Sequence, residues 1–269
     1  MNKNKNLTAE ETGRYWDGNA DAWTELVRAG YDHYRDLLNT PGFFSILPDI
    51  KGKLGLDIGC GEGHNTRLLA KVGAKMTALD ISERFILHAR GRENIETLGI
   101  AYLASPAQTL PFDGDSFDFV TAFMSLMDMP EIERVFGEVF RVLKPGGFFQ
   151  FSILHPCFIT PTRKNVFDTA GKVVAAELAG YFDGDKCSVD EWMFNGAPAN
   201  RPVDKFRIPY YHRTLSEWLN IALGSGLTLE YCHEPCPGEE VAEKYPSLAY
   251  ARVTAFFLHL RFRKNDGKL

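Results

Sequence analysis

Residues 54–70 read Leu-Gly-Leu-Asp-Ile-Gly-Cys-Gly-Glu-Gly-His-Asn-Thr-Arg-Leu-Leu-Ala, and the rest of the chain is organised around them. The alternating apolar side chains of residues 54–58 predict a buried strand, and the apolar residues at the end of the stretch predict a helix. Glycines at alternate positions separate the two elements and predict a tight turn. These glycines are Gly59, Gly61 and Gly63.

The turn is expected to hold a small polar ligand, because glycine allows backbone N–H groups to approach closely and the following helix begins with free N–H donors. No Lys-Ser or Lys-Thr pair follows, as a triphosphate site would require, and the spacing is not the G-x-G-x-x-G of dinucleotide sites. Asp57, just before the turn, would repel phosphate and attract an ammonium group. The ligand should therefore carry a positive charge near the turn.

The run from Asp57 to Gly63 resembles the first motif of the seven-stranded S-adenosylmethionine-dependent methyltransferases. A second predicted strand, residues 75–80, ends in Asp80, whose carboxylate can accept both ribose hydroxyls. The resemblance implies S-adenosyl-L-methionine as cofactor. Some cofactor contacts are implied by the resemblance, and we expect others next to these in the fold. Together the expected contacts are Asp57, Gly59, Cys60, Gly61, Asp80, Ile81, Ala107, Gln108 and Phe123.

The loop at residues 105–112 resembles the family segment Asp-Ala-x-x-Leu-Pro-Phe, in which the acid and adjacent backbone recognise adenine. Here Pro106 stands at the position of the acid. Adenine recognition is then expected from the Ala107 backbone, Gln108, Ser105 or water. Ile81 is expected against the adenine face, with a place in the core as the alternative.

The remaining chain alternates strands and helices, which predicts a parallel sheet covered by helices on both faces, with ligands at the carboxyl ends of the strands. A helix at residues 215–223, a strand at 227–233 and a final strand at 252–262, joined by a hairpin-like loop, suit the antiparallel last strand of the resembled family. The expected fold is α/β, doubly wound, with a mostly parallel seven-stranded sheet. Other predicted strands are residues 100–104, 115–123 and 148–154, and other predicted helices are residues 82–92 and 131–143.

Three parts of the chain are predicted. Residues 1–50 form an N-terminal helical cover, in which Pro41-Gly42 breaks the helical pattern and residues 43–50 form a linker. Residues 51–154 and 213–265 form the Rossmann-like core. Residues 155–212, rich in aromatic side chains, form an inserted substrate cap, since so long a stretch is unusual for a plain loop.

The substrate is expected between the segment after the fourth strand, the cover and the cap. Met and Phe side chains in residues 123–130 suit an apolar ligand and a sulfonium, although core packing would explain them as well. Methyl transfer is an in-line displacement that needs a base only if the acceptor loses a proton. His155 and His212 are the candidate bases, with structural roles as the alternative. The candidate substrate contacts are Trp16, Tyr31, Met124, Met127, Tyr210 and Tyr211.

Composition narrows the class of protein. The 269 residues are 45% hydrophobic with a formal net charge of −5, which argues against a nucleic-acid partner. No secretory signal and no membrane-spanning run are visible, so a cytoplasmic protein is expected. Cys232-His233-x-x-Cys236 lacks a second ligand pair at suitable spacing, so no metal is expected.

These features predict a methyltransferase acting on a small, partly hydrophobic acceptor. Two alternatives remain open. One is a protein that binds S-adenosylmethionine or S-adenosylhomocysteine without turnover, as a sensor or partner subunit. The other is a nicotinamide-dependent oxidoreductase, against which Asp57 and the glycine spacing argue.

Overall fold

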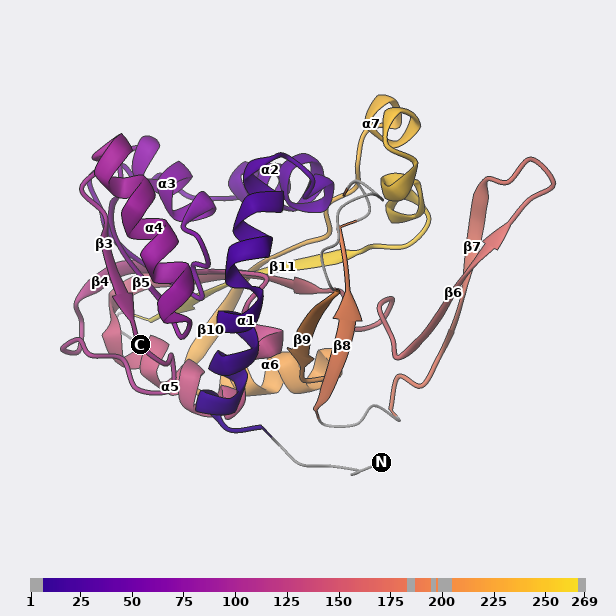
Figure 1. The fold of residues 1–269 in the computed structure, drawn as a ribbon. Coiled ribbons are helices and arrows are strands. Elements are labelled where there is room, and N and C mark those ends of the chain that lie inside the picture. Colours follow the sequence, from indigo (N-terminus) through magenta and orange to yellow (C-terminus); the bar gives the residue numbers. More distant parts are fainter. Residues whose placement is uncertain (1–6, 183–186, 195–196, 198–204, 266–269) are drawn as a thin grey trace.

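The computed structural model describes residues 7–182, 187–194, 197 and 205–265. Its centre is a seven-stranded sheet with the strand order β10-β11-β5-β4-β1-β2-β3 (Figure 1). Strands β1 to β5 pair in parallel, whereas β11 runs antiparallel to both β5 and β10. The expected mostly parallel sheet with an antiparallel last strand is confirmed. The strands are β1 (Leu54–Ile58), β2 (Lys75–Asp80), β3 (Ala101–Ala104), β4 (Phe117–Phe123), β5 (Leu143–Leu154), β10 (Leu227–His233) and β11 (Phe257–Lys264).

Helices cover both faces of the sheet, because the central strands are apolar on both faces. Successive residues of β4 show this: Phe119 packs with the core under α3 and α4, and Val120 with the core under α5 and α6. Side chains that alternate between faces in this way produce a doubly wound arrangement. The helices are α3 (His64–Lys71), α4 (Glu83–Glu96), α5 (Ile132–Val142) and α6 (Leu215–Gly224).

The N-terminal segment is helical for longer than the sequence indicated. It contains α1 (Ala9–Arg28), the π-helix η1 (Arg35–Asn39) and α2 (Thr40–Ser45). The predicted break at Pro41-Gly42 is therefore wrong, and the linker predicted at 43–50 is wrong for residues 43–45, whereas residues 46–50 lie outside the helix and lead into β1. Pro41 lies in the first turn of α2, where its missing N–H has no partner to lose, and the helix places Phe43 in the core, fully buried.

The insertion after β5 consists of two antiparallel hairpins. Strands β6 (Thr162–Phe167) and β7 (Val173–Ala179) form one, which projects away from the rest of the molecule (Figure 1). Strands β8 (Ser188–Trp192) and β9 (Phe206–Tyr210) form the other, and this hairpin lies against α1. The irregular strands expected in this insertion are thus two small sheets.

The chain between β10 and β11 differs from the expected hairpin-like loop. It contains α7 (Glu239–Lys244) and the 3-10 helix η3 (Pro246–Arg252). The last strand consequently begins at Phe257, not near Arg252, because η3 buries Leu248 and Ala251 as a helical face.

Candidate functional site

The glycine turn follows β1, and its three glycines have different surroundings. Their φ angles are 68° at Gly59, 54° at Gly61 and 84° at Gly63, a region that favours glycine. A Cβ on Gly59 would lie 2.4 Å from the Cβ of Ser125, and one on Gly63 would lie 2.6 Å from the Tyr102 hydroxyl. A Cβ on Gly61 would meet no described atom within 4 Å. Gly61 is therefore the glycine beside which a ligand can lie.

Asp80 reaches this turn from the end of β2. Its Oδ2 accepts the N–H of Gly61 at 2.8 Å, and its Oδ1 accepts the N–H of Ser82 at 2.9 Å. The side chain is 8% exposed, and burial raises the pKa of the carboxyl to about 6. The structure thus brings Asp80 and Gly61 together, as the two motifs predicted.

Asp57 lies beneath the turn. Its oxygens accept the hydroxyl hydrogens of Thr66 at 2.5 Å and Thr121 at 2.8 Å. Burial, followed by the nearby charge of Asp80, raises the pKa of Asp57 to about 7 despite these hydrogen bonds. Since the side chain is 1% exposed, it can act on a ligand through its field and through the shape of the turn, but not by open contact.

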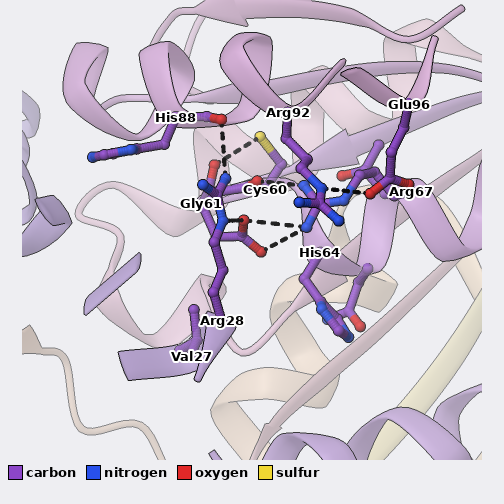
Figure 2. A network of polar contacts seen from close by, with 12 residues as sticks. Val27, Arg28, Cys60, Gly61, His64, Arg67, His88, Arg92 and Glu96 are labelled. Carbon is purple, nitrogen blue, oxygen red and sulfur yellow. Dashed lines mark hydrogen bonds and ion pairs between the residues drawn. The ribbon is translucent and has the colours of Figure 1, made fainter. Parts of the chain in front are cut away.

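A charged network that the sequence did not reveal fastens α1 to the turn (Figure 2). Arg28, the last residue of α1, donates from Nε to Glu62 at 2.8 Å and from a terminal nitrogen to the carbonyl of His88 at 3.0 Å. Glu62 lies within the turn and also pairs with Arg67 at 2.9 Å. Arg28 therefore ties the cover to both the turn and α4. The signal in the sequence was a buried acid among glycines, which requires a cation.

The inner face of α1 packs on α4. A Cβ on Gly13 would lie 3.2 Å from Cγ1 of Ile81, so the helix backbone approaches the residue after Asp80 closely. The ring of Trp16 contacts Trp23 edge-on at 5.5 Å and Phe85 at 6.1 Å between centroids. The structure therefore places Gly13 against Ile81 and Trp16 against Phe85, where α1 meets the end of β2 and the start of α4.

Tyr31 lies elsewhere. It packs with an aromatic and aliphatic cluster that holds the β8–β9 hairpin on α1. In this cluster the Trp23 ring lies 4.8 Å from Phe194 and 4.9 Å from Phe206. Tyr31 thus belongs to the contact between cover and insertion.

The loop after β3 is held in place by a buried side chain. Gln108 is buried, and its side-chain amide donates to the carbonyl of Pro130 at 2.7 Å. The Ala107 side chain is part of the main core. Gln108 therefore positions the loop through Pro130.

Cys60 is half-buried at the turn, where burial and the nearby carboxylates of Asp80 and Asp57 raise the pKa of its thiol.

The segment after β4 turns sharply. The Phe123 ring packs against Phe43 of α2, with 3.9 Å between ring centroids and 36° between the ring planes, so it faces the cover. Met124 adopts a positive φ of 52° and donates its N–H to the carbonyl of Ser152 at 3.0 Å. Met127 is buried in the 3-10 turn η2 (Leu126–Asp128).

His155 has both ring nitrogens engaged. Nδ1 accepts the N–H of Cys157 at 3.2 Å, which places the proton on Nε2, and Nε2 lies 2.7 Å from a carboxylate oxygen of Glu234. Burial lowers the pKa of the ring, against the opposing effect of Glu234. This geometry favours the structural alternative for His155, because no lone pair is free to accept a proton.

His212 forms a hydrogen bond through only one of its ring nitrogens within the described residues. Nε2 lies 2.9 Å from the carbonyl of Tyr181 and donates to it, while Nδ1 is buried with no partner among the described residues. The adjacent Tyr211 donates its N–H to the carbonyl of Met127 at 2.8 Å and its hydroxyl to Leu7 at 3.0 Å. Burial raises the pKa of Tyr210, followed by the charge of Asp128.

Asp128 is the acid that sequence reasoning missed. It is 6% exposed, and burial, followed by the charges of Asp190 and Asp80, raises the pKa of its carboxyl well above the ordinary value. The signal was present, since Asp128 is the only charged residue in the apolar run at positions 123–129.

Among the described residues, no group of three or more His, Cys, Asp or Glu side chains could hold a metal ion. Within the same residues, none of the helices combines the length and hydropathy needed to cross a membrane.

Sequence comparison relates the core to known proteins. The model of the family described as "Methyltransferase domain" matches residues 56–151. The ubiquinone biosynthesis O-methyltransferase of Coxiella burnetii is 32% identical over 156 residues, which cover 57% of this chain and 65% of that protein. The fatty-acid O-methyltransferase of Mycolicibacterium smegmatis is 36% identical over 179 residues, covering 59% and 65%. The match thus spans slightly less than two thirds of these relatives.

Solved structures extend the similarity to most of the fold. An S-adenosylmethionine-dependent methyltransferase from Mesorhizobium loti superposes with a TM-score of 0.67 at 27% identity, covering 83% of this chain and 96% of that one. The 1,6-didemethyltoxoflavin-N1-methyltransferase of Burkholderia thailandensis superposes with a TM-score of 0.60 at 14% identity, covering 98% and 94%. The second likeness concerns the fold alone.

Proposed function

We propose that this chain, whose residues 56–151 match the model of a methyltransferase domain, is a seven-stranded S-adenosylmethionine-dependent methyltransferase that transfers the methyl group of that cofactor to a small, partly hydrophobic acceptor. One observation supports the cofactor's place above all others: Asp80 meets Gly61 at the one glycine of the turn that has open space beside it. The names of the two O-methyltransferase relatives, which concern ubiquinone biosynthesis and fatty acids, favour an acceptor with apolar surface.

Asp80 is suited to bind the ribose. A carboxylate has about four lone-pair positions, and two N–H groups occupy only one on each oxygen. The remaining lone pairs can accept the two ribose hydroxyls. Gly59 and Gly61 supply backbone at the turn, with Cys60 between them. Asp57, held by two threonines, contributes negative charge below the position of the cofactor's ammonium and sulfonium.

The adenine would lie between Ile81, the backbone at Ala107 and the loop that Gln108 fixes. Gln108 serves this site by positioning, since its amide is already bonded to Pro130. Phe123 packs against Phe43, and it would support the same edge of the site from the side of α2.

The acceptor would lie between the turn and the covering segments. We assign residues 1–50 to a cover and residues 155–212 to a substrate cap, around the core at 51–154 and 213–265. The cap contacts η2 through Tyr211, and the cover contacts the glycine turn through Arg28. The side chains that would surround the acceptor are Trp16, Met124, Met127, Tyr210 and Tyr211, whereas Tyr31 packs in the contact between the cover and the insertion.

The bound cofactor supplies an activated methyl group and its own leaving group. The chain must then align the acceptor with the methyl carbon and exclude water. Met124 and Met127 provide polarizable apolar walls, and the Arg28 network holds α1 over the turn. No protein nucleophile is required for a direct displacement.

The test uses S-adenosyl-[methyl-3H]methionine with fractionated cell extract. Label in the small-molecule fraction, extractable into organic solvent, is the expected result. Label confined to protein or RNA would contradict a small acceptor. Binding of S-adenosylhomocysteine by calorimetry with no labelled fraction would favour a binding protein without turnover, and retention of NAD in its place would favour an oxidoreductase.

A further inference from the structure

Asp128 differs from the other buried acids of the site. Asp57 accepts two hydroxyl hydrogens, Asp80 accepts two backbone N–H groups, and Glu62 pairs with two arginines. Asp128 is 6% exposed, and no hydrogen bond or ion pair joins its carboxylate to another group in the described parts of the chain. Its oxygens are not among the fully buried side-chain atoms that lack a partner there, which is consistent with a carboxylate open to a small ligand. A desolvated carboxylate of this kind is a candidate for a functional role.

The position of Asp128 is fixed by three contacts of its segment. Ser125 donates its hydroxyl to the carbonyl of Ile58 at 2.9 Å, directly before the glycine turn. Pro130 accepts from Gln108 of the adenine-side loop, and Met127 accepts the N–H of Tyr211. Asp128 therefore lies where the turn, the loop after β3 and the insertion meet.

The charges around Asp128 come from four elements. Asp190 on β8 and Asp80 at the end of β2 repel its ionised form, and Tyr210 on β9 lies within the same electrostatic environment. Arg213, before α6, attracts it. The Arg213 guanidinium, however, donates to the carbonyl of Met129 at 3.0 Å and lies over the rings of Tyr211 and Trp218, so its N–H groups are directed elsewhere.

We propose that Asp128 is the general base that removes a proton from the hydroxyl or amine of the acceptor; this role rests on the proposed methyltransferase function. The acceptor oxygen or nitrogen forms a bond to the methyl carbon with its lone pair. The carbon–sulfur bond breaks, its electron pair stays on sulfur, and S-adenosylhomocysteine is produced. The proton of the acceptor passes to an Asp128 oxygen and then to solvent.

This assignment accounts for the histidines as well. His155 has no free lone pair, because Cys157 and Glu234 occupy both ring nitrogens. His212 has a free Nδ1 but is anchored to Tyr181, in the insertion. Asp128 instead lies within the electrostatic range of Asp80, the residue that marks the cofactor edge.

The experiment compares the wild type with Asp128→Asn and Asp128→Ala, using the labelled acceptor fraction and S-adenosyl-[methyl-3H]methionine. We expect kcat to fall by about 100-fold or more in both variants, because general-base catalysis contributes about that much, while S-adenosylhomocysteine affinity stays within about threefold. The control Glu243→Gln removes an exposed acid on α7 and should behave as the wild type.

Two further readouts separate catalysis from a structural role. The kcat of the wild type should rise with pH through the pKa of Asp128, and Asp190→Asn should shift that rise to lower pH by removing a repelling charge. At pH 8 the free Asp128→Asn protein should melt at a higher temperature than the wild type, since the variant no longer contains a carboxyl group whose ionised form is destabilised by burial.

Four results would overturn the proposal. Transfer by Asp128→Asn at the wild-type rate would overturn the role of Asp128 and leave the methyltransferase function intact, and loss of transfer in His212→Asn alone would assign the base to His212. Destabilisation of Asp128→Asn at pH 8 would assign a structural role. Absence of transfer by the wild type itself would overturn the proposed function together with this role.

Discussion

The Oδ2 atom of Asp80 accepts the backbone N–H of Gly61 at 2.8 Å, which joins the end of β2 to the turn that follows β1. Nineteen positions separate the two residues in the chain, and parallel pairing of β1 with β2 brings them together. The carboxylate keeps unused lone pairs next to the open space at Gly61. This contact is the basis for the proposed place of the ribose.

Asp80→Asn should weaken S-adenosylhomocysteine binding by about 1.5 to 3 kcal/mol, because a charge-assisted hydrogen bond to the ribose becomes a neutral one or is lost. Isothermal titration calorimetry measures this directly. Asp113→Asn, at an exposed acid in the loop before β4, is the matched control. Equal affinities in all three proteins would remove Asp80 from the cofactor site.

Cofactor binding should also depend on pH through Asp80. Its pKa is raised to about 6 in the free protein, and hydroxyl donors bind the ionised form better. The affinity for S-adenosylhomocysteine should therefore fall as the pH drops below about 6. The difference in binding free energy between wild type and Asp80→Asn should narrow over the same range, and a constant difference from pH 7 to pH 4.5 would contradict this account.

Gly61→Ala should lose cofactor binding, whereas Gly59→Ala should lose stability of the fold. A Cβ on Gly61 enters open space, so the folded state loses only about 1 to 2 kcal/mol from the positive φ, while cofactor binding is blocked. A Cβ on Gly59 would collide with Ser125 at 2.4 Å, and that variant should lose far more stability. Urea unfolding and calorimetry on both proteins distinguish the two effects; similar behaviour of the variants would show that the turn has no ligand-facing side.

Arg28→Met should loosen the N-terminal cover. The variant retains much of the apolar stem but removes the bonds to Glu62 and to the His88 carbonyl. Since Arg67 still pairs with Glu62, we expect a loss of about 1 kcal/mol in stability, faster hydrogen exchange in α1 and faster cofactor release. Arg14→Met, at an exposed residue of the same helix, is the control. Unchanged exchange in α1 would show that the network does not hold the cover.

Asp57→Asn should change the pH dependence of stability. The pKa of Asp57 is about 7 in the folded protein and near 4 in an unfolded chain. Between these values the folded state holds a proton that the unfolded state has lost, so the wild type loses stability as pH rises from about 4 to 7.

The size of this change follows from the same pKa difference. Each pKa unit of difference between the folded and the unfolded state corresponds to about 1.4 kcal/mol of stability. The Asp57→Asn variant lacks the pH dependence that arises from this carboxyl. The free energy of unfolding of the wild type, relative to the variant, should fall by a few kcal/mol across that window. Denaturant titrations at pH 4.5, 6 and 7.5 measure it, and a difference that grows with pH would have the wrong sign.

The sequence predicted the central sheet well because its strands carry strong local signals. Apolar runs, the glycine turn and the acid after β2 specified β1, α3 and β2 almost to the residue. It failed at residues 40–45 and 239–252, where the chain forms helices. Pro41 is compatible with a first helical turn, and the buried Phe43 ring packs against Phe123, which is distant in the chain.

The candidate site was predictable where a motif specifies backbone, and less so where side chains meet across the fold. The pairing of Gly61 with Asp80 followed from the two motifs. The contact of Arg28 with Glu62, that of His155 with Glu234, and the burial of Asp128 without a partner among the described residues each depend on residues distant in the chain. No local pattern encodes such partners.

The most direct measurement of the central claim is a crystal structure of the protein with S-adenosylhomocysteine bound. Both ribose hydroxyls should lie within hydrogen-bonding distance of the Asp80 carboxylate, with the homocysteine part of the ligand beside Gly61. A ligand bound elsewhere, or a ribose with no contact to Asp80, would contradict the account.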